Sequence, residues 1–330
     1  MRSILPFGFI AMVAVLGQPA AMAQTAGGTR LVSGLPVESV TVVNVRPSQE
    51  TIKSFVEKRA APTRTLGKMA RWTDRICPSV TGLGDKYAKY IVQRIRDIAQ
   101  AVDAPLNSDA ACHPNIDVVF TTAPQAFMDN IRKQQPMLLG DHYNDTEAKR
   151  MAKVTHPIQA WYATDIVDFD GARIFQDLTC RDRGVTLEAD EGNSSADGTA
   201  SVTKQQMEMP CAIAVRSSGS RINNGLSSGL LNVLIVAEPA KLFDFEIGSL
   251  ADYIAMLALS QPASLDSCQL LPSISNMLAA GCTSIPARIT DGDLAYLRAL
   301  YKMPNGTSLV IQRDEIEFQM QKTLVTDKAG

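Results

Sequence analysis

The chain has 330 residues, 45% of them hydrophobic and 20% charged, and a formal net charge of −2. This length is enough for one large domain or two small ones with a sizeable core. A near-neutral chain without a long basic run gives no electrostatic reason to bind nucleic acid or anionic lipid, so neither is predicted as a partner.

The N-terminus has the pattern of a secretory signal peptide. Arg2 precedes an apolar run, residues 4–16, and the run closes on the small-x-small sequence Ala21-Met22-Ala23. Cleavage after this pattern would remove residues 1–23. The alternative is an uncleaved membrane anchor, but the apolar run is short for a span. The chain is therefore expected to be periplasmic or secreted, with no membrane span after signal cleavage.

Six cysteines follow the signal peptide, and an even count in an exported chain indicates disulfides. Several connectivities are possible. Pairing between sequence neighbours is favoured, because each resulting loop is local. The expected pairs are Cys77–Cys112, Cys180–Cys211 and Cys268–Cys282. The sequence has no C-x-x-C, so neither a redox motif nor a zinc knuckle is indicated.

The first half of the chain predicts a sheet covered by helices. A small, polar stretch, residues 24–36, is expected to be a disordered lead-in to one domain, residues 37–330. Alternating residues predict strands and apolar stripes at helical spacing predict helices. The strands are expected at 39–45 and 115–122, and the helices at 48–59, 85–102 and 124–134.

The middle of the chain carries turn and loop signals. Asp170-Gly171 lies between two β-rich runs in residues 160–175, which is a strong hairpin signal. Residues 188–204 are rich in Gly, Ser and acidic side chains, so they are expected to form a flexible loop that is too polar to pack.

The next two predicted strands frame a candidate binding loop. The strands are expected at 212–216 and 230–237, and residues 217–229 join them. Loops of this length without regular structure are often functional. The polar side chains that it offers are Arg221, Asn223 and Asn224.

Residues 248–261 are predicted to form the helix at the centre of the core. They are apolar on nearly all faces, and a helix of this kind is buried. The segment is too short to cross a bilayer, so the rest of the protein must bury it. It carries Asp252 and Tyr253 but no histidine or glutamate. Further along, Thr290-x-x-Asp293 resembles a capping box that would begin another helix.

No motif predicts a catalytic, cofactor-binding or metal-ligating residue. Residues 225–229 match the G-x-S-x-G elbow of hydrolases, but a strand and not a helix is expected after the serine. The three histidines, His113, His142 and His156, are scattered. A cofactor is accordingly not expected.

A resemblance in order and pattern extends over most of the chain. It rests on Arg71-Trp72, Cys77-Pro78, the helix at 85–102, the strand from Asn115, the helix at 250–261 and Thr290-x-x-Asp293-x-x-Tyr296-Leu297-x-x-Leu300-Tyr301. Together these resemble a family of secreted bacterial proteins of unknown function whose layout is similar to that of the zincin-like metallopeptidases.

The resemblance implies a fold without its chemistry. Where a zincin has H-E-x-x-H, this sequence has Ala-Asp-Tyr-Ile-Ala-Met at 251–256, so no zinc ligand or general base carries over. The expected fold class is α+β, a mixed sheet covered by helices and braced by disulfides. The expected function is that of an exported, non-catalytic or degenerate metallopeptidase-like binding protein. The alternative is a secreted hydrolase with a non-standard active site.

Overall fold

The computed structural model describes residues 47–109, 111–168, 173, 187–194, 200–207 and 225–326. Several predicted features lie outside these residues. They are the signal peptide and lead-in, the strands at 39–45 and 212–216, the Asp170-Gly171 turn, the Cys180–Cys211 pair and the loop side chains Arg221, Asn223 and Asn224.

Strand β7 (Ser227–Ala237) is the centre of a five-stranded sheet. One of its edges pairs antiparallel with β4 (Ile158–Val167) along the whole strand. Its other edge pairs in parallel with β1 (Ala70–Trp72) and then with β3 (Ile116–Phe120), and β2 (Pro78–Thr81) extends the sheet beyond β3. The sheet is mixed and mostly parallel, and among the described residues β4 is its one antiparallel strand.

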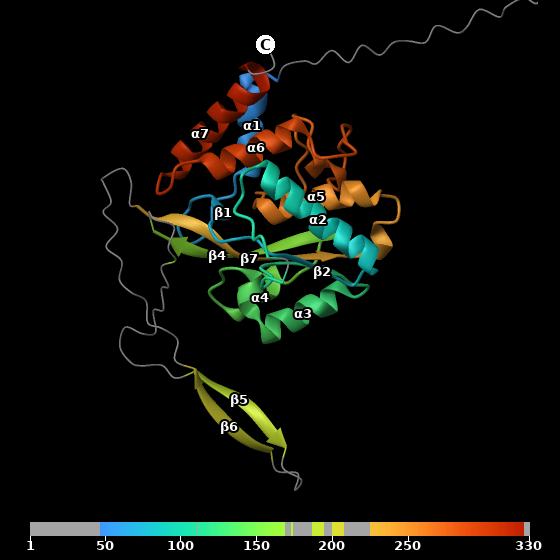
Figure 1. Cartoon of the computed structure of the whole chain (residues 1–330), viewed down its shortest axis with the longest axis vertical. Coiled ribbons are helices and arrows are strands. Elements are labelled where there is room, and N and C mark those ends of the chain that lie inside the picture. The colour runs from blue at the N-terminus through green and yellow to red at the C-terminus, as the bar shows by residue number, and fades with distance from the viewer. Residues whose placement is uncertain are drawn as a thin grey trace, which may run out of the picture. The chain divides into compact units, whose positions relative to one another are not determined.

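Helices cover both faces of the sheet, so the architecture is mixed α/β (Figure 1). On one face, Val233 and Ile235 of β7 pack into a large core, and on the other face Leu234 and Val236 pack into a smaller one. The helices of the large core are α1 (Gln49–Arg59), α2 (Asp85–Ala101), α5 (Ile247–Leu259), α6 (Asp291–Lys302) and α7 (Leu309–Gln321). Those of the smaller core are α3 (Pro124–Gln134), η1 (Pro136–Leu139) and α4 (Asp145–Met151).

Two described strands lie in the region where the sequence predicts a flexible loop. They are β5 (Leu187–Ser194) and β6 (Ala200–Met207), which pair with each other as a two-stranded antiparallel sheet. Such a ladder is made by backbone groups, which every residue other than proline supplies. The flexible loop near residues 188–204 stays a prediction.

Helix α5 is buried on all sides, as its composition predicts. Every residue from Gly248 to Leu259 is buried. The helix ends at Leu259 without a C-capping glycine, so its last carbonyl groups need other donors. Aromatic side chains supply them. Tyr162 donates to the Leu257 oxygen at 3.0 Å, and Trp72 and Tyr301 donate to the next two carbonyl oxygens at 2.8 Å each.

Asp252 of α5 anchors the helix to its neighbours. Its side chain is fully buried and forms ion pairs with Arg94 of α2 and with Arg288. It also accepts a hydrogen bond of 2.8 Å from the Ile289 backbone N–H. Burial alone would raise the pKa of the Asp252 carboxyl, but these three donors outweigh burial and lower it.

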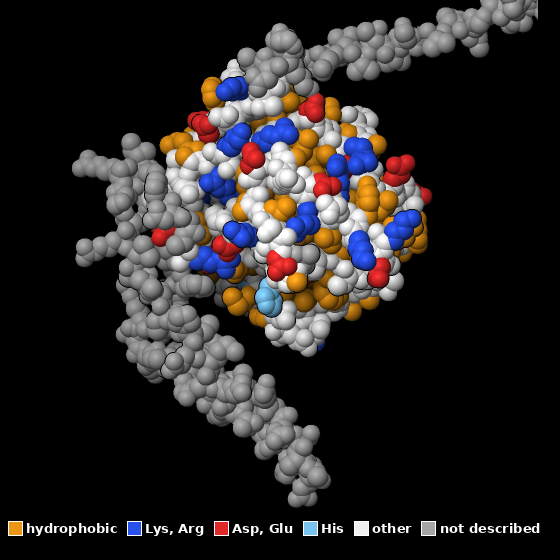
Figure 2. Space-filling model, in the orientation of Figure 1, with side chains coloured by type: hydrophobic (Ala, Val, Ile, Leu, Met, Phe, Trp, Pro, Cys, Tyr) orange, Lys and Arg blue, Asp and Glu red, His pale blue; other side chains and the backbone are white. Residues whose placement is uncertain are grey.

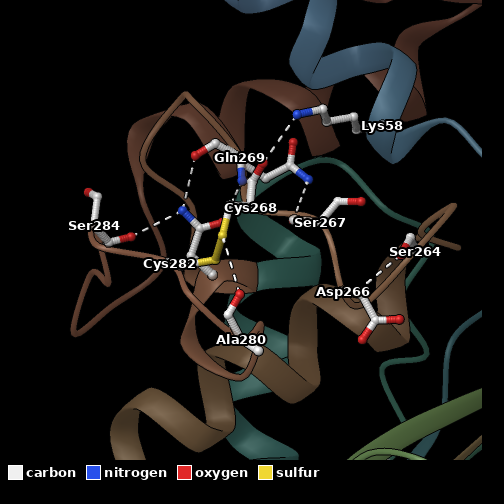
Figure 3. The surroundings of a disulfide bond; sticks show 10 residues. Lys58, Ser264, Asp266, Ser267, Cys268, Gln269, Ala280, Cys282 and Ser284 are labelled. Carbon is white, nitrogen blue, oxygen red and sulfur yellow. Dashed lines mark hydrogen bonds between the residues drawn. A yellow bond between two sulfur atoms is a disulfide. The ribbon is translucent and has the colours of Figure 1, made fainter.

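In the part of the chain that the structure describes, two disulfides brace the large core. Cys77–Cys112 links the start of β2 to the segment before β3, and Cys268–Cys282 closes the segment that follows α5. Both join sequence neighbours. Figure 3 shows the second bridge, where Lys58 of α1 donates to the Cys268 carbonyl oxygen at 3.2 Å. The segment after α5 is therefore tied to the first helix.

The capping box at the start of α6 is confirmed. Thr290 Oγ1 accepts from the Asp293 backbone N–H at 3.1 Å, and the Asp293 carboxylate accepts from the Thr290 N–H at 3.1 Å. The same carboxylate accepts from the Ile274 backbone N–H at 2.9 Å. The capping box thus also fixes the segment between Cys268 and Cys282.

Candidate functional site

The clearest candidate site is a cavity of about 440 Å³ along the outer edge of β4, named here the edge cavity. It is lined by four consecutive residues of the strand, Gln159 to Tyr162. Successive side chains of a strand point to opposite faces, so a cavity that contacts all four lies beside the strand and not on one face. Thr164 of the same strand also lines the cavity, and the remaining lining comes from other segments: residues 62–64, 139–141, 147, 150, 151 and 261.

The outer edge of β4 has no strand partner in the described chain, although Gly140 lies against the Tyr162 carbonyl oxygen. Among the described residues, β4 pairs as a strand with β7 alone, and an isolated bridge joins Val167 to Arg173 at its end. An edge strand presents unpaired N–H and C=O groups at alternate positions. The edge cavity is therefore bounded on one side by main-chain donors and acceptors.

A charged cluster closes one end of the edge cavity. Arg64 forms an ion pair with Glu147 of α4, and its guanidinium lies over the Tyr143 ring, 4.0 Å from the centroid. The Arg64 guanidinium holds the pKa of the Glu147 carboxyl below its usual range. Arg150 reaches the same carboxylate at 3.3 Å. Two arginines thus share one glutamate at this end.

Asp141 connects the same end of the cavity to β4. Its Oδ2 accepts hydrogen bonds from Thr65 at 2.5 Å and from Thr164 of β4 at 3.3 Å. Burial raises the pKa of the neighbouring Asp165 carboxyl, and the negative charge of Asp141 adds to that effect. These bonds hold the segment before β1 against β4.

Gln261, just after α5, gives the edge cavity an acceptor without a donor. Its side chain lines the cavity, and its buried Oε1 has no hydrogen-bond partner within the described part of the chain. A buried amide oxygen without a donor carries a desolvation cost.

A second, smaller cavity of about 200 Å³ adjoins the first and shares Gln159, Ala160 and Tyr162 with it. Two of its lining residues, Thr155 and His156, form a hydroxyl–imidazole–carboxylate chain with Asp266. Thr155 Oγ1 lies 2.8 Å from Nδ1 of His156, and Nε2 of the same ring lies 2.8 Å from Oδ1 of Asp266. The Asp266 side chain is 79% exposed, so this chain of groups is largely solvated.

The described residues do not provide the ligands of a catalytic zinc. Nowhere among them do three His, Cys, Asp or Glu side chains gather closely enough to hold a metal ion. On α5 the carboxylate is that of Asp252, and two arginines and a backbone N–H already use its oxygens. The other loop histidine near the edge cavity, His142, hydrogen-bonds the Gly140 carbonyl oxygen at 2.8 Å through Nδ1.

The surface carries charges of both signs. Figure 2 shows Lys and Arg interspersed with Asp and Glu across the face it presents, without a broad area of one sign. In the part of the chain that the structure describes, no helix is both long and apolar enough to span a bilayer.

Comparison of the chain with protein-family models, with curated proteins and with solved structures found no match. The site therefore has to be interpreted from its own geometry. Sequence reasoning missed the edge cavity, because its lining comes from five separate stretches of the chain that share no motif. The local signal that it could have used is Gln261, a polar residue directly after an apolar helix.

Proposed function

We propose that this protein is an exported, non-catalytic or degenerate zincin-like binding protein, and that it binds an extended polypeptide along the free edge of β4. The observation that carries the proposal is that β4, whose residues line the edge cavity, has no second strand partner in the described chain. An extended peptide can add a strand to such an edge, with main-chain hydrogen bonds for affinity and side-chain pockets for specificity.

The outer strands of the sheet differ in their suitability for strand addition. Strand β4 has ten residues, whereas β1 has three, and β2 has four and begins with Pro78, which has no N–H. Short edge strands and edge prolines are features that block pairing with another chain. A groove of about 720 Å³ between α2 and β2 is larger than the edge cavity, but it lies beside β2, which is less suitable for strand addition.

The arrangement around α5 supports the zincin-like part of the proposal. A buried helix lies beneath a mostly parallel sheet whose one antiparallel strand forms an edge. The zinc ligands of a zincin have no equivalent on α5, because the Asp252 carboxylate is used to anchor the helix. The two disulfides support export, because such bonds persist mainly in oxidising compartments.

Binding can be tested with a tiled library of synthetic peptides and the mature protein. The best-binding peptide is then resynthesised with a single N-methyl group at each successive position. Strand addition predicts that methylation abolishes binding at every second residue, because alternate N–H groups of an added strand face β4. If the loss of binding depends on which side chain the methylated residue carries, and does not alternate along the peptide, strand addition is refuted.

A pair of matched glutamine variants tests the role of the edge cavity. Gln261→Leu removes the unpaired acceptor in the cavity and should weaken peptide binding about tenfold, which corresponds to one hydrogen bond of about 1.4 kcal/mol. Gln269 is the control. Its Oε1 is also buried without a partner in the described chain, but the residue lies in the segment between Cys268 and Cys282. Gln269→Leu should leave binding unchanged.

A second candidate is the hydrolase, which the Thr155–His156–Asp266 chain favours. With Nε2–H donating to Asp266, the imidazole Nδ1 could accept the Thr155 proton as its oxygen attacks an acyl carbon. The proton would then pass to the leaving group, and water would release the acyl group from the threonine. Thr155 also lies 3.2 Å from Gln159 Oε1, which competes for the same proton.

Ester and peptide substrates distinguish the two candidates. The binding proposal predicts that bound peptide is recovered intact. Hydrolysis that is lost in both Thr155→Val and His156→Gln, but not in His113→Gln, would favour the hydrolase.

A further inference from the structure

Arg59 occupies a position that the pattern of α1 assigns to an apolar residue. The buried face of this helix consists of Ile52, Phe55, Val56 and Arg59, which follow the i, i+3, i+4, i+7 spacing of a core-facing stripe. Arg59 is 1% exposed. The helix therefore places a permanent positive charge inside the large core.

The guanidinium of Arg59 has no hydrogen-bond acceptor among the described residues. Its Nε, Nη1 and Nη2 are all buried without a partner, and no carboxylate of the described chain forms an ion pair with it. Its nearest aromatic neighbour is Tyr296, whose ring centroid lies 6.0 Å from Cζ. That distance is at the outer limit of a cation–π contact, so the ring offsets little of the charge.

The tyrosines around Arg59 do not neutralise it. Burial raises the pKa of Tyr253 and of Tyr296 to about 12 each, against the opposing influence of the Arg59 charge. Burial raises the pKa of Tyr162 as well. All three phenols are therefore uncharged at neutral pH. The Tyr296 hydroxyl is itself buried without a partner in the described chain.

An unpaired cation in a protein interior is strongly disfavoured, and a guanidinium has five N–H groups to satisfy. Bound water would accept some of these hydrogens but would leave the charge. An anion would satisfy both requirements. Because Arg59 is almost fully enclosed, the anion must be small.

We infer that Arg59 and Tyr296 form an internal binding site for a small monovalent anion of the size of chloride. The guanidinium supplies the charge and several donors, and the Tyr296 hydroxyl, from the ring that the guanidinium faces, supplies one more. The site links α1 to α6, so its occupant should stabilise the folded chain. It is separate from the edge cavity and does not depend on the proposed peptide binding.

Thermal melts of the full mature chain test this inference. The parent protein is compared in sodium chloride and in sodium gluconate at equal ionic strength, because gluconate is too large to enter. The melting temperature should rise with chloride by about 2–5 °C for each tenfold increase once the site is mostly occupied. Arg59→Met should abolish the difference between the two salts. Arg298→Met, at a half-buried arginine that bonds only the Ala101 carbonyl oxygen in the described chain, should retain it.

Crystals of the parent protein soaked in bromide provide a readout that does not depend on any variant. An anomalous peak beside the Arg59 guanidinium is expected. Only water at that position, or a chloride dependence that persists in Arg59→Met, would overturn the inference.

Discussion

The indole Nε1 of Trp72 donates a hydrogen bond of 2.8 Å to the carbonyl oxygen of Ala258, across 186 positions of sequence. Trp72 is the last residue of β1, and Ala258 lies in the last turn of α5. Together with the hydroxyls of Tyr162 and Tyr301, this indole donates hydrogen bonds to the last carbonyl oxygens of α5. In many helices a C-capping glycine allows backbone N–H groups to satisfy these oxygens instead. The end of the central helix is thus closed by side chains from three other elements.

Removing one of these donors should destabilise the protein. Tyr301→Phe keeps the ring but leaves the buried Leu259 oxygen without its 2.8 Å bond. The free energy of unfolding, measured by urea denaturation, should fall by about 1–3 kcal/mol. Tyr143→Phe is the control, because Tyr143 is 80% exposed and its loss of a hydroxyl should have no measurable effect. Equal stability of the two variants would show that Tyr301 does not cap α5.

Asp252→Asn should lower the free energy of unfolding by about 2–4 kcal/mol, because it leaves two arginines without their shared carboxylate. The lower end of this range reflects the partial exposure of Arg94 and Arg288. Asp145→Asn, at an exposed ion pair on α4, should resemble the parent. A reversal of this order in urea melts would contradict the anchoring role of Asp252.

The same carboxylate predicts an acid dependence. The pKa of Asp252 is lowered in the folded state, so its contribution to stability is present above the ordinary pKa of about 3.9 and is lost as the pH falls toward the folded value. The unfolding free energy of the parent should therefore decrease more steeply below about pH 4 than that of Asp252→Asn. Parallel pH profiles would argue against this linkage.

Truncation within α5 tests its place at the centre of the core. Leu257 is 1% exposed, and Leu257→Ala should cost about 2–5 kcal/mol through lost apolar contacts and the remaining cavity. Leu270 is 72% exposed, so Leu270→Ala should change the unfolding free energy by less than about 0.5 kcal/mol. Similar costs in the two variants would place Leu257 outside the core.

The two disulfides should differ modestly in their contributions. Their cysteines are 35 and 14 positions apart. By the chain-entropy relation, loss of Cys77–Cys112 should cost about 4 kcal/mol and loss of Cys268–Cys282 about 3 kcal/mol. Paired Cys→Ser variants, compared by urea denaturation, measure both values. A negligible cost for either bridge would contradict its bracing role.

Local patterns predicted much of the fold. The apolar stripe of α2, the all-round apolar α5 and the Thr290–Asp293 capping box depend on residues within a few positions of each other. Such spacings are visible in one sequence, because the helical repeat fixes which side chains share a face. Helix α2 was expected at 85–102 and ends one residue earlier.

The candidate site could not be predicted in the same way. The edge cavity depends on which strand lies at the outside of the sheet, and that follows from the pairing of β4 with β7 across about 70 residues of chain. The burial of Arg59 was equally hidden. An arginine at the end of a helix usually lies in solvent near the C-terminal carbonyl groups, so its chemistry alone gave no indication of a place in the core.

The position of β7 in the sheet also constrains the order in which the chain can fold. It is the last strand of this sheet in sequence, yet β1, β3 and β4 all pair with it. A chain emerging from its N-terminus cannot complete the sheet until Ala237 is available, so the earlier strands must wait without their central partner. Release of a truncated nascent chain that ends before Ser227 should therefore yield a protease-sensitive product, whereas one that extends beyond α7 should resist digestion.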